Sequence, residues 1–249
     1  MAARVLCLLC LIWLATANAG DFKKGVGLAE SAGLGEEQLL ALRVAWYYNW
    51  RPTSGIKTQM PFVPMAFRIS SIEKLPASSA AVLGFNEPDH EKQANLSVSQ
   101  ALSAWPALQA RTQLAGAPAM AKNPLKKDSW LMEFMSGVPK VDFITLHWYK
   151  GANVQKFISD VQALCALYRK PVWVTEFAPQ TAAGARKNPA RYSQAEVEAF
   201  MAASTQWMEQ SDCVHRYAWH DAKVGTSALF EGRELTATGR AYAQVRSEE

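Results

Sequence analysis

The 249-residue sequence lacks the patterns that mark several large classes of protein. Its net charge is only +4 and its lysines and arginines are scattered, so no basic stripe indicates a nucleic-acid-binding surface. Its four histidines show no paired spacing of the kind that metal ligands adopt, and we expect neither a metal ion nor another cofactor. The absence of a G-x-S-x-G motif argues against a serine hydrolase.

Long apolar runs are also absent beyond the N-terminus. There an arginine precedes the apolar residues 5–15, and Ala17 and Ala19 follow in the small-x-small pattern of a signal peptidase site. The run is too short to span a bilayer comfortably, so a retained membrane anchor is the less favoured alternative. We expect a signal peptide over residues 1–19 and one domain over residues 20–249. The mature protein should be secreted or periplasmic, monomeric and free of membrane contact.

Apolar stretches that suit buried strands alternate with amphipathic stretches along the chain. Residues 153–168 repeat apolar side chains at helical spacing, and Ser193 opens a capping box before another amphipathic run. Asp128 and Gly137 are the expected ends of a shorter helix, and Pro106 is expected to interrupt the helix that precedes the fifth strand. The predicted strands are residues 24–29, 44–49, 62–67, 81–86, 113–118, 142–149, 171–177 and 215–220.

Eight strand–helix units in a chain of this length indicate an α/β protein with a single (β/α)₈ barrel, or TIM barrel. A doubly wound parallel sheet is the alternative, but it would normally carry a glycine-rich phosphate loop after an early strand, and the sequence has none. The active site of a (β/α)₈ barrel lies at the C-terminal ends of its strands. The residues at those ends are therefore the candidates for chemistry.

Cysteine is scarce, because only Cys165 and Cys213 remain once the signal peptide is removed. In an oxidising compartment such a pair can form one disulfide, and two separate buried thiols are the alternative. Cys165 lies on the helix before the seventh predicted strand and Cys213 just before the eighth. We predict a bridge, which requires Cα atoms within about 7 Å of each other.

Two of the predicted strands end at a glutamate. Glu87 lies in the stretch GFNEPD (84–89), where Pro88 should stop strand pairing and push Glu87 toward an extended backbone. Glu176 lies near the end of PVWVTEF (171–177). Both side chains share the parity of inward-facing strand residues. An ordinary surface turn with a solvated glutamate is the alternative for the first stretch.

Polar and aromatic side chains crowd the same strand ends. Aromatic faces suit the C–H faces of sugar rings, and a pair of carboxylates between them is what glycoside hydrolysis needs. Core packing is the alternative for the aromatic residues and is favoured for Trp105, Trp173 and Trp207, and a structural role is the alternative for His147. The candidate substrate-binding residues are Trp46, Tyr48, Asn49, Trp50, Asn86, His147, Tyr149 and Trp219.

Five ordered motifs resemble those of glycoside hydrolase family 128, a family of secreted endo-β-1,3-glucanases in clan A. The likeness spans about residues 23–221. It implies a (β/α)₈ barrel, a retaining mechanism and β-1,3-glucan as substrate. The motifs are WYYNW (46–50), FVPM (62–65), GFNEPD (84–89) with QANLS (93–97) after it, LHWY (146–149) and WVTEFA (173–178).

The resemblance also implies a role for individual residues. Glu87 would be the acid/base and Glu176 the nucleophile. Asn86 would hold the 2-hydroxyl of the sugar and Tyr149 would lie near the nucleophile. Trp219 would form the floor of the cleaving subsite, and the peptide bond that follows it would be cis.

The sequence therefore predicts an exported, retaining endo-β-1,3-glucanase whose partner is a β-glucan polysaccharide or oligosaccharide. One alternative is a clan A β-glycanase with another linkage preference, and a second is a non-catalytic glycan-binding protein of the cell wall. A retaining enzyme needs its two carboxyl groups about 5–5.5 Å apart, whereas an inverting one needs about 6.5–9.5 Å. We predict the shorter spacing.

Overall fold

The computed structural model describes residues 23–220 and 224–245. The predicted signal peptide, residues 1–19, lies outside the described residues. Within them, no helix has both the length and the apolar character needed to cross a membrane.

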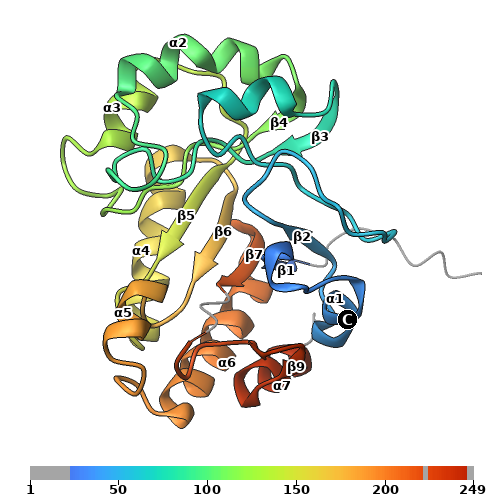
Figure 1. Ribbon diagram of the computed structural model, residues 1–249. Coiled ribbons are helices and arrows are strands. Elements are labelled where there is room, and N and C mark those ends of the chain that lie inside the picture. Colours follow the sequence, from blue (N-terminus) through green and yellow to red (C-terminus); the bar gives the residue numbers. More distant parts are fainter. Residues whose placement is uncertain (1–22, 221–223, 246–249) are drawn as a thin grey trace, which may run out of the picture.

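A parallel sheet of five strands forms the centre of the fold (Figure 1). In spatial order its strands are β2 (Trp46–Tyr48), β1 (Lys24–Gly27), β7 (Val214–His220), β6 (Val172–Phe177) and β5 (Ile144–Trp148). A second parallel pair consists of β3 (Ser79–Val82) and β4 (Thr112–Ala115), and a short antiparallel hairpin of β8 (Phe230–Glu231) and β9 (Glu234–Leu235).

Isolated parallel bridges lie between these sheets. They pair Tyr47 with Phe62, Met65 with Leu83, Asn86 with Ala119 and Gly116 with Phe143. The strand predicted over residues 62–67 is thereby reduced to single bridges, because Pro64 has no N–H group to continue a ladder. The α/β class and the parallel sheet are confirmed, whereas the closed barrel stays a prediction.

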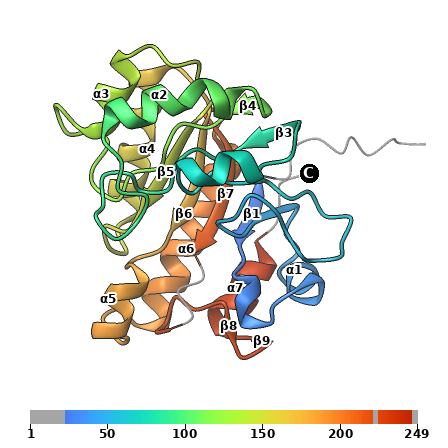
Figure 2. The ribbon, with the colours of Figure 1, turned by 45° about the horizontal axis from the view of Figure 1, so that its top comes forward.

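Helices cover the outer side of the strands (Figure 2). α2 packs against β4 and α3 packs against α2, while α4 and α6 pack on each other and against β5, β6 and β7. The helices are α1 (Glu36–Leu42), α2 (Val98–Gln109), α3 (Trp130–Ser136), α4 (Val154–Tyr168), α5 (Ala182–Lys187), α6 (Gln194–Gln210) and α7 (Ala237–Gln244), with short 3₁₀ helices η1 (Glu30–Ala32) and η2 (Ile69–Lys74).

Local sequence signals set most helix ends. Ser193 caps α6 through the predicted capping box, and its hydroxyl accepts from the backbone N–H of Glu196. The predicted cap at Asp128 is wrong by one residue, because the hydroxyl of Ser129 accepts from Met132 N–H instead. The predicted interruption at Pro106 is wrong, because α2 continues through it to Gln109. Packing of the buried face of α2, which includes Leu108 beyond the proline, offsets the backbone hydrogen bond that Pro106 cannot make.

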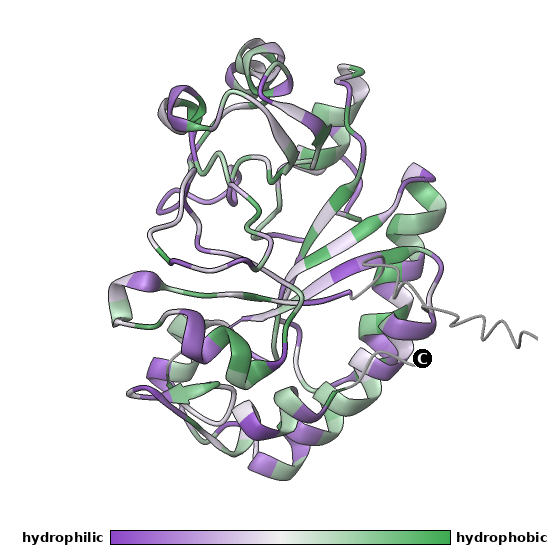
Figure 3. Ribbon diagram, turned by 90° about the vertical axis from the view of Figure 1, so that its right-hand side faces the viewer, coloured by the Kyte–Doolittle hydropathy of each residue, from purple (hydrophilic) through white to green (hydrophobic). Residues whose placement is uncertain are grey.

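The interior has two apolar clusters, one between strands and helices and one within the curve of the strands. Figure 3 shows hydrophobic and hydrophilic residues mixed along the bordering helices, as expected for elements buried on one face. The inner cluster contains Trp46, Phe143 and Trp173, and the Arg216 guanidinium stacks 4.5 Å from the Trp173 ring. This packed layer lies inside the strands, next to the ends that carry the candidate site residues. Gly25 makes it possible, because a Cβ there would lie 2.2 Å from the Trp46 indole.

A disulfide joins Cys165 of α4 to Cys213, immediately before β7, with Cα atoms 6.2 Å apart. The predicted bridge is therefore confirmed. It ties the helix that packs behind β5 and β6 to the start of β7.

We expect the double variant Cys165→Ser/Cys213→Ser to lose unfolding free energy. The bridge closes a loop of 48 residues, and the chain-entropy relation gives about 4 kcal/mol for a loop of that length. Urea unfolding of both proteins followed by circular dichroism measures the difference. An unchanged urea midpoint would contradict this stabilising role.

Candidate active site

Two buried glutamates meet at the strand ends. Glu176 is the penultimate residue of β6, and Glu87 follows β3 at the position next to the Asn86–Ala119 bridge. Glu87 is 9% exposed and Glu176 is 5% exposed. One carboxylate oxygen of each, together with one ring nitrogen of His147, lies within 4.8 Å of the others. Residues far apart in the sequence thus form one cluster.

The backbone of Glu87 differs from the extended form predicted from the proline after it. Glu87 has φ +44°, in the left-handed region. Its N–H donates to Ala119 O (2.8 Å) and its carbonyl accepts from His90 N–H (3.0 Å), so a turn begins at this residue. These bonds hold a conformation that costs about 1–2 kcal/mol for a non-glycine residue. The strained backbone conformation therefore lies at Glu87, the candidate acid/base.

His147, at the end of β5, lies between the two carboxylates. Its Nδ1 is 2.9 Å from Glu87 Oε1 and 3.4 Å from Glu176 Oε2. Burial acts to lower the pKa of His147, but the charges of Glu176 and Glu87 and the hydrogen bond to Glu87 outweigh it and raise the pKa above 6.5. The raised pKa favours the imidazolium form of His147, whose charge lies beside the Glu176 carboxylate.

Glu176 is held by several donors. Trp50 Nε1 donates to Oε1 (2.7 Å), the Tyr149 hydroxyl donates to Oε2 (2.5 Å), and the Tyr48 hydroxyl lies 3.4 Å from Oε1. Burial acts to raise the pKa of Glu176, but the nearby His147 and His220 and the bonds from Tyr149 and Trp50 lower it below 4.5. The carboxylate is thus kept ionised and oriented.

These shifts predict a pH window for stability. The depressed pKa of Glu176 contributes stability that is present above 4.5 and lost as pH falls through the folded pKa. The raised pKa of His147 contributes stability that is full below 6.5 and lost as pH rises through the folded pKa. Together, Glu176 and His147 contribute most to the free energy of unfolding between pH 4.5 and 6.5.

The variant His147→Gln should remove the alkaline part of that dependence. We expect the difference in unfolding free energy between the native protein and the variant to shrink as pH rises above 6.5. Urea unfolding across a pH series measures it. A difference that stays constant from pH 6 to pH 9 would contradict the raised pKa of His147.

Other predicted substrate-binding residues lie outside the cluster. Trp46 and Trp219 are buried, with 1% and 0% of their surface exposed, and their ring nitrogens donate to Lys23 O and Ser227 O. Neither ring is exposed to solvent in the structure, and the predicted substrate contact stays a prediction for both. Asn49 is also buried, and its amide group binds Glu30 instead of facing the site.

The peptide bond after Trp219 is trans, and no cis bond is present among the described residues. The prediction of a cis bond at this place is therefore wrong. Trp219 turns toward Phe177 and Phe200, in the core on the helix side of the sheet. The ordinary trans form, favoured by about 3–4 kcal/mol, suffices for that packing.

The next residue, His220, takes the inward position instead. Its Nε2 is 3.9 Å from Glu176 Oε2, and its ring meets Trp50 and Tyr149 edge to face. Strand parity was the available signal, because Ala218 of β7 belongs to the inner cluster and His220 is two residues further on. No role for His220 was predicted from the sequence.

Asn86 lies beside Glu87 and is almost fully buried. Its Nδ2 donates to Gln93 Oε1 (3.3 Å), and its Oδ1 has no hydrogen-bond partner in the described part of the chain. A buried acceptor without a partner is costly, so this atom is suited to a hydroxyl of a ligand.

The cluster opens into a hollow of about 380 Å³. Glu87, Glu176, His147, Tyr149 and His220 line its base. Polar and basic side chains that are half-buried or exposed also line it, among them His90, Gln93, Lys122, Lys150 and Arg186.

Comparison with known proteins identifies the family. A family profile described as "Glycosyl hydrolase catalytic core" matches residues 30–242. The crystal structure of a family 128, subgroup I, endo-β-1,3-glucanase from Amycolatopsis mediterranei in complex with laminaripentaose is 34% identical. It covers 89% of this chain and 98% of its own, with a TM-score of 0.79. The chain belongs to glycoside hydrolase family 128.

Two other relatives show the range of proteins that resemble this family 128 chain. An oligosaccharide-binding protein of subgroup VII from Trichoderma gamsii is 25% identical, with 89% of this chain and 92% of that one covered and a TM-score of 0.71. Alkali-sensitive linkage protein 1 of Schizosaccharomyces pombe is 30% identical over 214 residues, which are 79% of this chain. The family 128 chain spans only 38% of the length of that relative.

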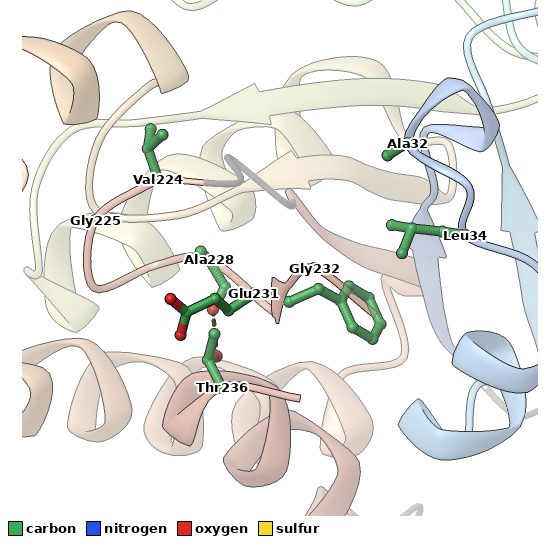
Figure 4. A pocket seen from close by; sticks show the side chains of 9 residues that line it. Ala32, Leu34, Val224, Gly225, Ala228, Glu231, Gly232 and Thr236 are labelled. Atoms are coloured by element: carbon green, nitrogen blue, oxygen red, sulfur yellow. Dashed lines mark hydrogen bonds between the residues drawn. The ribbon is translucent and has the colours of Figure 1, made fainter. Parts of the chain in front are cut away.

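A second, larger hollow lies beside the β8–β9 hairpin of the family 128 chain (Figure 4). Its volume is about 530 Å³, and small side chains such as Ala32, Ala228 and Thr236 line it. Among the described residues that line it, Glu231 is the one carboxylate. Two carboxylates, Glu87 and Glu176, line the first hollow instead, which makes it the candidate site for glycoside hydrolysis.

The group Glu87, His147 and Glu176 also has the donor types that could hold a metal ion. Sequence spacing did not reveal this group, because its members come from three separate segments of the chain. The contacts that His147 Nδ1 makes at 2.9 and 3.4 Å have the lengths of hydrogen bonds and ion pairs. Glycoside hydrolysis by a pair of carboxylates needs no metal at any step.

Proposed function

We propose that this protein is a β-1,3-glucan hydrolase that cleaves internal bonds and retains the anomeric configuration. The observation that carries the proposal is the pair Glu87 and Glu176, with one oxygen of each within 4.8 Å. That spacing leaves too little room for the water that an inverting enzyme places between its carboxylates. Family membership and the laminaripentaose complex of the Amycolatopsis enzyme support the substrate.

In the first step, Glu176 attacks the anomeric carbon while Glu87 gives its proton to the departing glycosidic oxygen. A covalent glycosyl ester forms on Glu176 and the aglycone leaves as an alcohol. The lowered pKa of Glu176 keeps the nucleophile ionised. Trp50 and Tyr149 orient it, and the pKa of Tyr149 is raised well above 10.0, chiefly by burial, so its hydroxyl stays protonated.

In the second step, Glu87 takes a proton from water, whose oxygen attacks the anomeric carbon and displaces Glu176. The product has the β configuration of the substrate. His147 contacts both carboxylates and balances the charge that moves between them. Asn86 Oδ1 accepts from the 2-hydroxyl of the sugar, an interaction that satisfies this buried atom.

We infer that the strands close into one (β/α)₈ barrel. The bridges at Phe62, Met65 and Gly116 lie in the right order to join β2 to β3 and β4 to β5 around a ring. The profile match over residues 30–242 supports a single domain. The N-terminal pattern of residues 1–19 supports export, and we propose a secreted or periplasmic monomer.

Glycan binding without hydrolysis is the second candidate, favoured by the likeness to the Trichoderma oligosaccharide-binding protein. Simple binding needs no oriented pair of carboxylates, and here both are present with their partners. A clan A glycanase of other linkage preference is the third.

Release of reducing sugar from laminarin, pachyman, lichenan, cellulose and xylan separates these functions. We expect release from laminarin and pachyman, with a series of oligosaccharides as first products. Glucose alone as first product would indicate an exo enzyme, and release from xylan or cellulose a different linkage. Binding of laminarin without release of reducing sugar would indicate a glycan-binding protein that is not an enzyme.

A further inference from the structure

A turn after β2 is anchored by a carboxylate outside the active site. Glu30, the first residue of η1, accepts at Oε1 from Asn49 Nδ2 (2.6 Å) and from the Ser54 hydroxyl (2.6 Å). Its Oε2 accepts from the backbone N–H of Gly55 (2.9 Å). Glu30 therefore binds both ends of residues 49–55.

That turn carries Trp50 in a strained conformation. Trp50 has φ +60°, an outlier for a bulky side chain, and such strain persists only where neighbouring contacts fix it. Asn49 supplies contacts on the far side of Trp50, since its Oδ1 accepts from Arg51 N–H (2.9 Å) and its Nδ2 also donates to Thr53 O (2.9 Å). The network around Glu30 thus defines where the indole points.

The indole lies between β1 and the nucleophile. A Cβ at Gly27 would be 2.8 Å from the Trp50 ring, so the ring rests against a strand residue that has no side chain. The indole Nε1 donates to Glu176 Oε1 at 2.7 Å. Contact with His220 and Tyr48 confines it further.

We propose that Glu30 is a positioning residue that acts on Glu176 through Asn49 and Trp50. By fixing the turn, it aims the indole N–H at the nucleophile and so helps to keep that carboxylate ionised and oriented. Glu30 touches no reacting atom. The proposal rests on the proposed function only in naming Glu176 as the nucleophile.

Charge on Glu30 is compatible with this role. Burial acts to raise the pKa of Glu30, but the hydrogen bonds from Ser54, Gly55 and Asn49 lower it below 4.5. The variant Glu30→Gln keeps the size of the side chain but turns an N–H donor toward Gly55 N–H or toward Asn49. One anchor of the turn is then lost.

The test is a ¹³C NMR titration of the Glu176 carboxyl in protein labelled at glutamate. We expect Glu30→Gln and Trp50→Phe each to raise the pKa of Glu176, and the double variant to titrate like Trp50→Phe alone. Glu36→Gln, which removes an exposed carboxylate from the nearby α1, should leave the pKa unchanged. The other groups that face Glu176 keep their identity in every variant and are Tyr48, Glu87, His147, Tyr149 and His220.

A second perturbation reaches Trp50 without changing Glu30. Gly27→Ala should press on the indole and also raise the pKa of Glu176. A Glu30→Gln protein that folds and titrates like the native protein would overturn the proposal. So would shifts from Glu30→Gln and Trp50→Phe that add in the double variant, because Glu30 would then act by another route.

Kinetics separate this inference from the proposed function. On laminarin, the acidic limb of kcat/KM should move to higher pH in Glu30→Gln, and kcat of Trp50→Phe should fall about tenfold, the scale of one hydrogen bond to a charged group. If the variants shift the pKa of Glu176 but the native protein hydrolyses no glucan, the positioning role of Glu30 stands and the proposed function fails. If the native protein hydrolyses glucan but the variants leave the pKa of Glu176 unchanged, the positioning role of Glu30 fails.

Discussion

Glu176→Ala should abolish hydrolysis of every substrate, with kcat lower by about 10⁴- to 10⁶-fold, the scale on which hydrolases respond to loss of a nucleophile. No covalent intermediate can form without this carboxylate, so an activated leaving group cannot compensate. Initial rates on laminarin and on an aryl β-glucoside oligosaccharide measure the loss. Glu73→Gln, which changes an exposed carboxylate on η2, should retain full activity.

Removal of Glu176 also leaves buried donors on Trp50 and Tyr149 without their acceptor. Glu176→Gln keeps an acceptor for one of them and the shape of the side chain, so it separates chemistry from stability. We expect it to be as inactive as the alanine variant while melting closer to the native protein. Substantial activity in a folded Glu176→Gln protein would contradict the assignment.

Glu87→Ala should fail in a different way. On laminarin the loss of the proton donor should cost about 10²- to 10⁴-fold in kcat. On substrates with good leaving groups the first step needs little protonation, so the variant should form the glycosyl ester at a near-native rate. A burst of released phenol from a dinitrophenyl glycoside, followed by slow turnover, is the expected time course.

Azide should rescue Glu87→Ala but not Glu176→Ala. The small anion fits the space left by the carboxylate and attacks the ester without a general base, so the product is a β-glycosyl azide. ¹H NMR identifies that product. Equal responses of the two variants to azide and to leaving group would show that the two roles are wrongly assigned.

Continuous apolar runs and helical periodicity explain how much of the fold and the site could be predicted from the sequence. VWVTEF is a continuous buried run, so a glutamate at the end of β6 was expected. Strand parity alone did not place it, because Val172 and Val174, which share the parity of Glu176, belong to the cluster between strands and helices, and a register shift between Val174 and Phe177 turns Glu176 to the site. The amphipathic pattern of residues 153–168 likewise matched α4, with Asn153 as its cap. Both elements are long and carry a clear apolar pattern.

Backbone deviations account for most of what the sequence could not show. The left-handed turn at Glu87 depends on bonds to Ala119 and His90 that no local rule contains. His220, by contrast, follows the plain alternation of β7, in which Tyr217 and Trp219 face the core between strands and helices and Ala218 faces the inner cluster. Glu30 was missed because its partners become neighbours only once the turn after β2 is folded.

The measurement that tests the central claim most directly is the configuration of the first-formed product. Laminarin oligosaccharides are hydrolysed in a ¹H NMR tube, and the anomeric signals are followed before mutarotation equilibrates them. With Glu87 and Glu176 held within 4.8 Å, we predict that the β-anomer is formed first and the α-anomer grows only at the rate of mutarotation. Initial formation of the α-anomer would contradict the two-glutamate double displacement proposed for this protein.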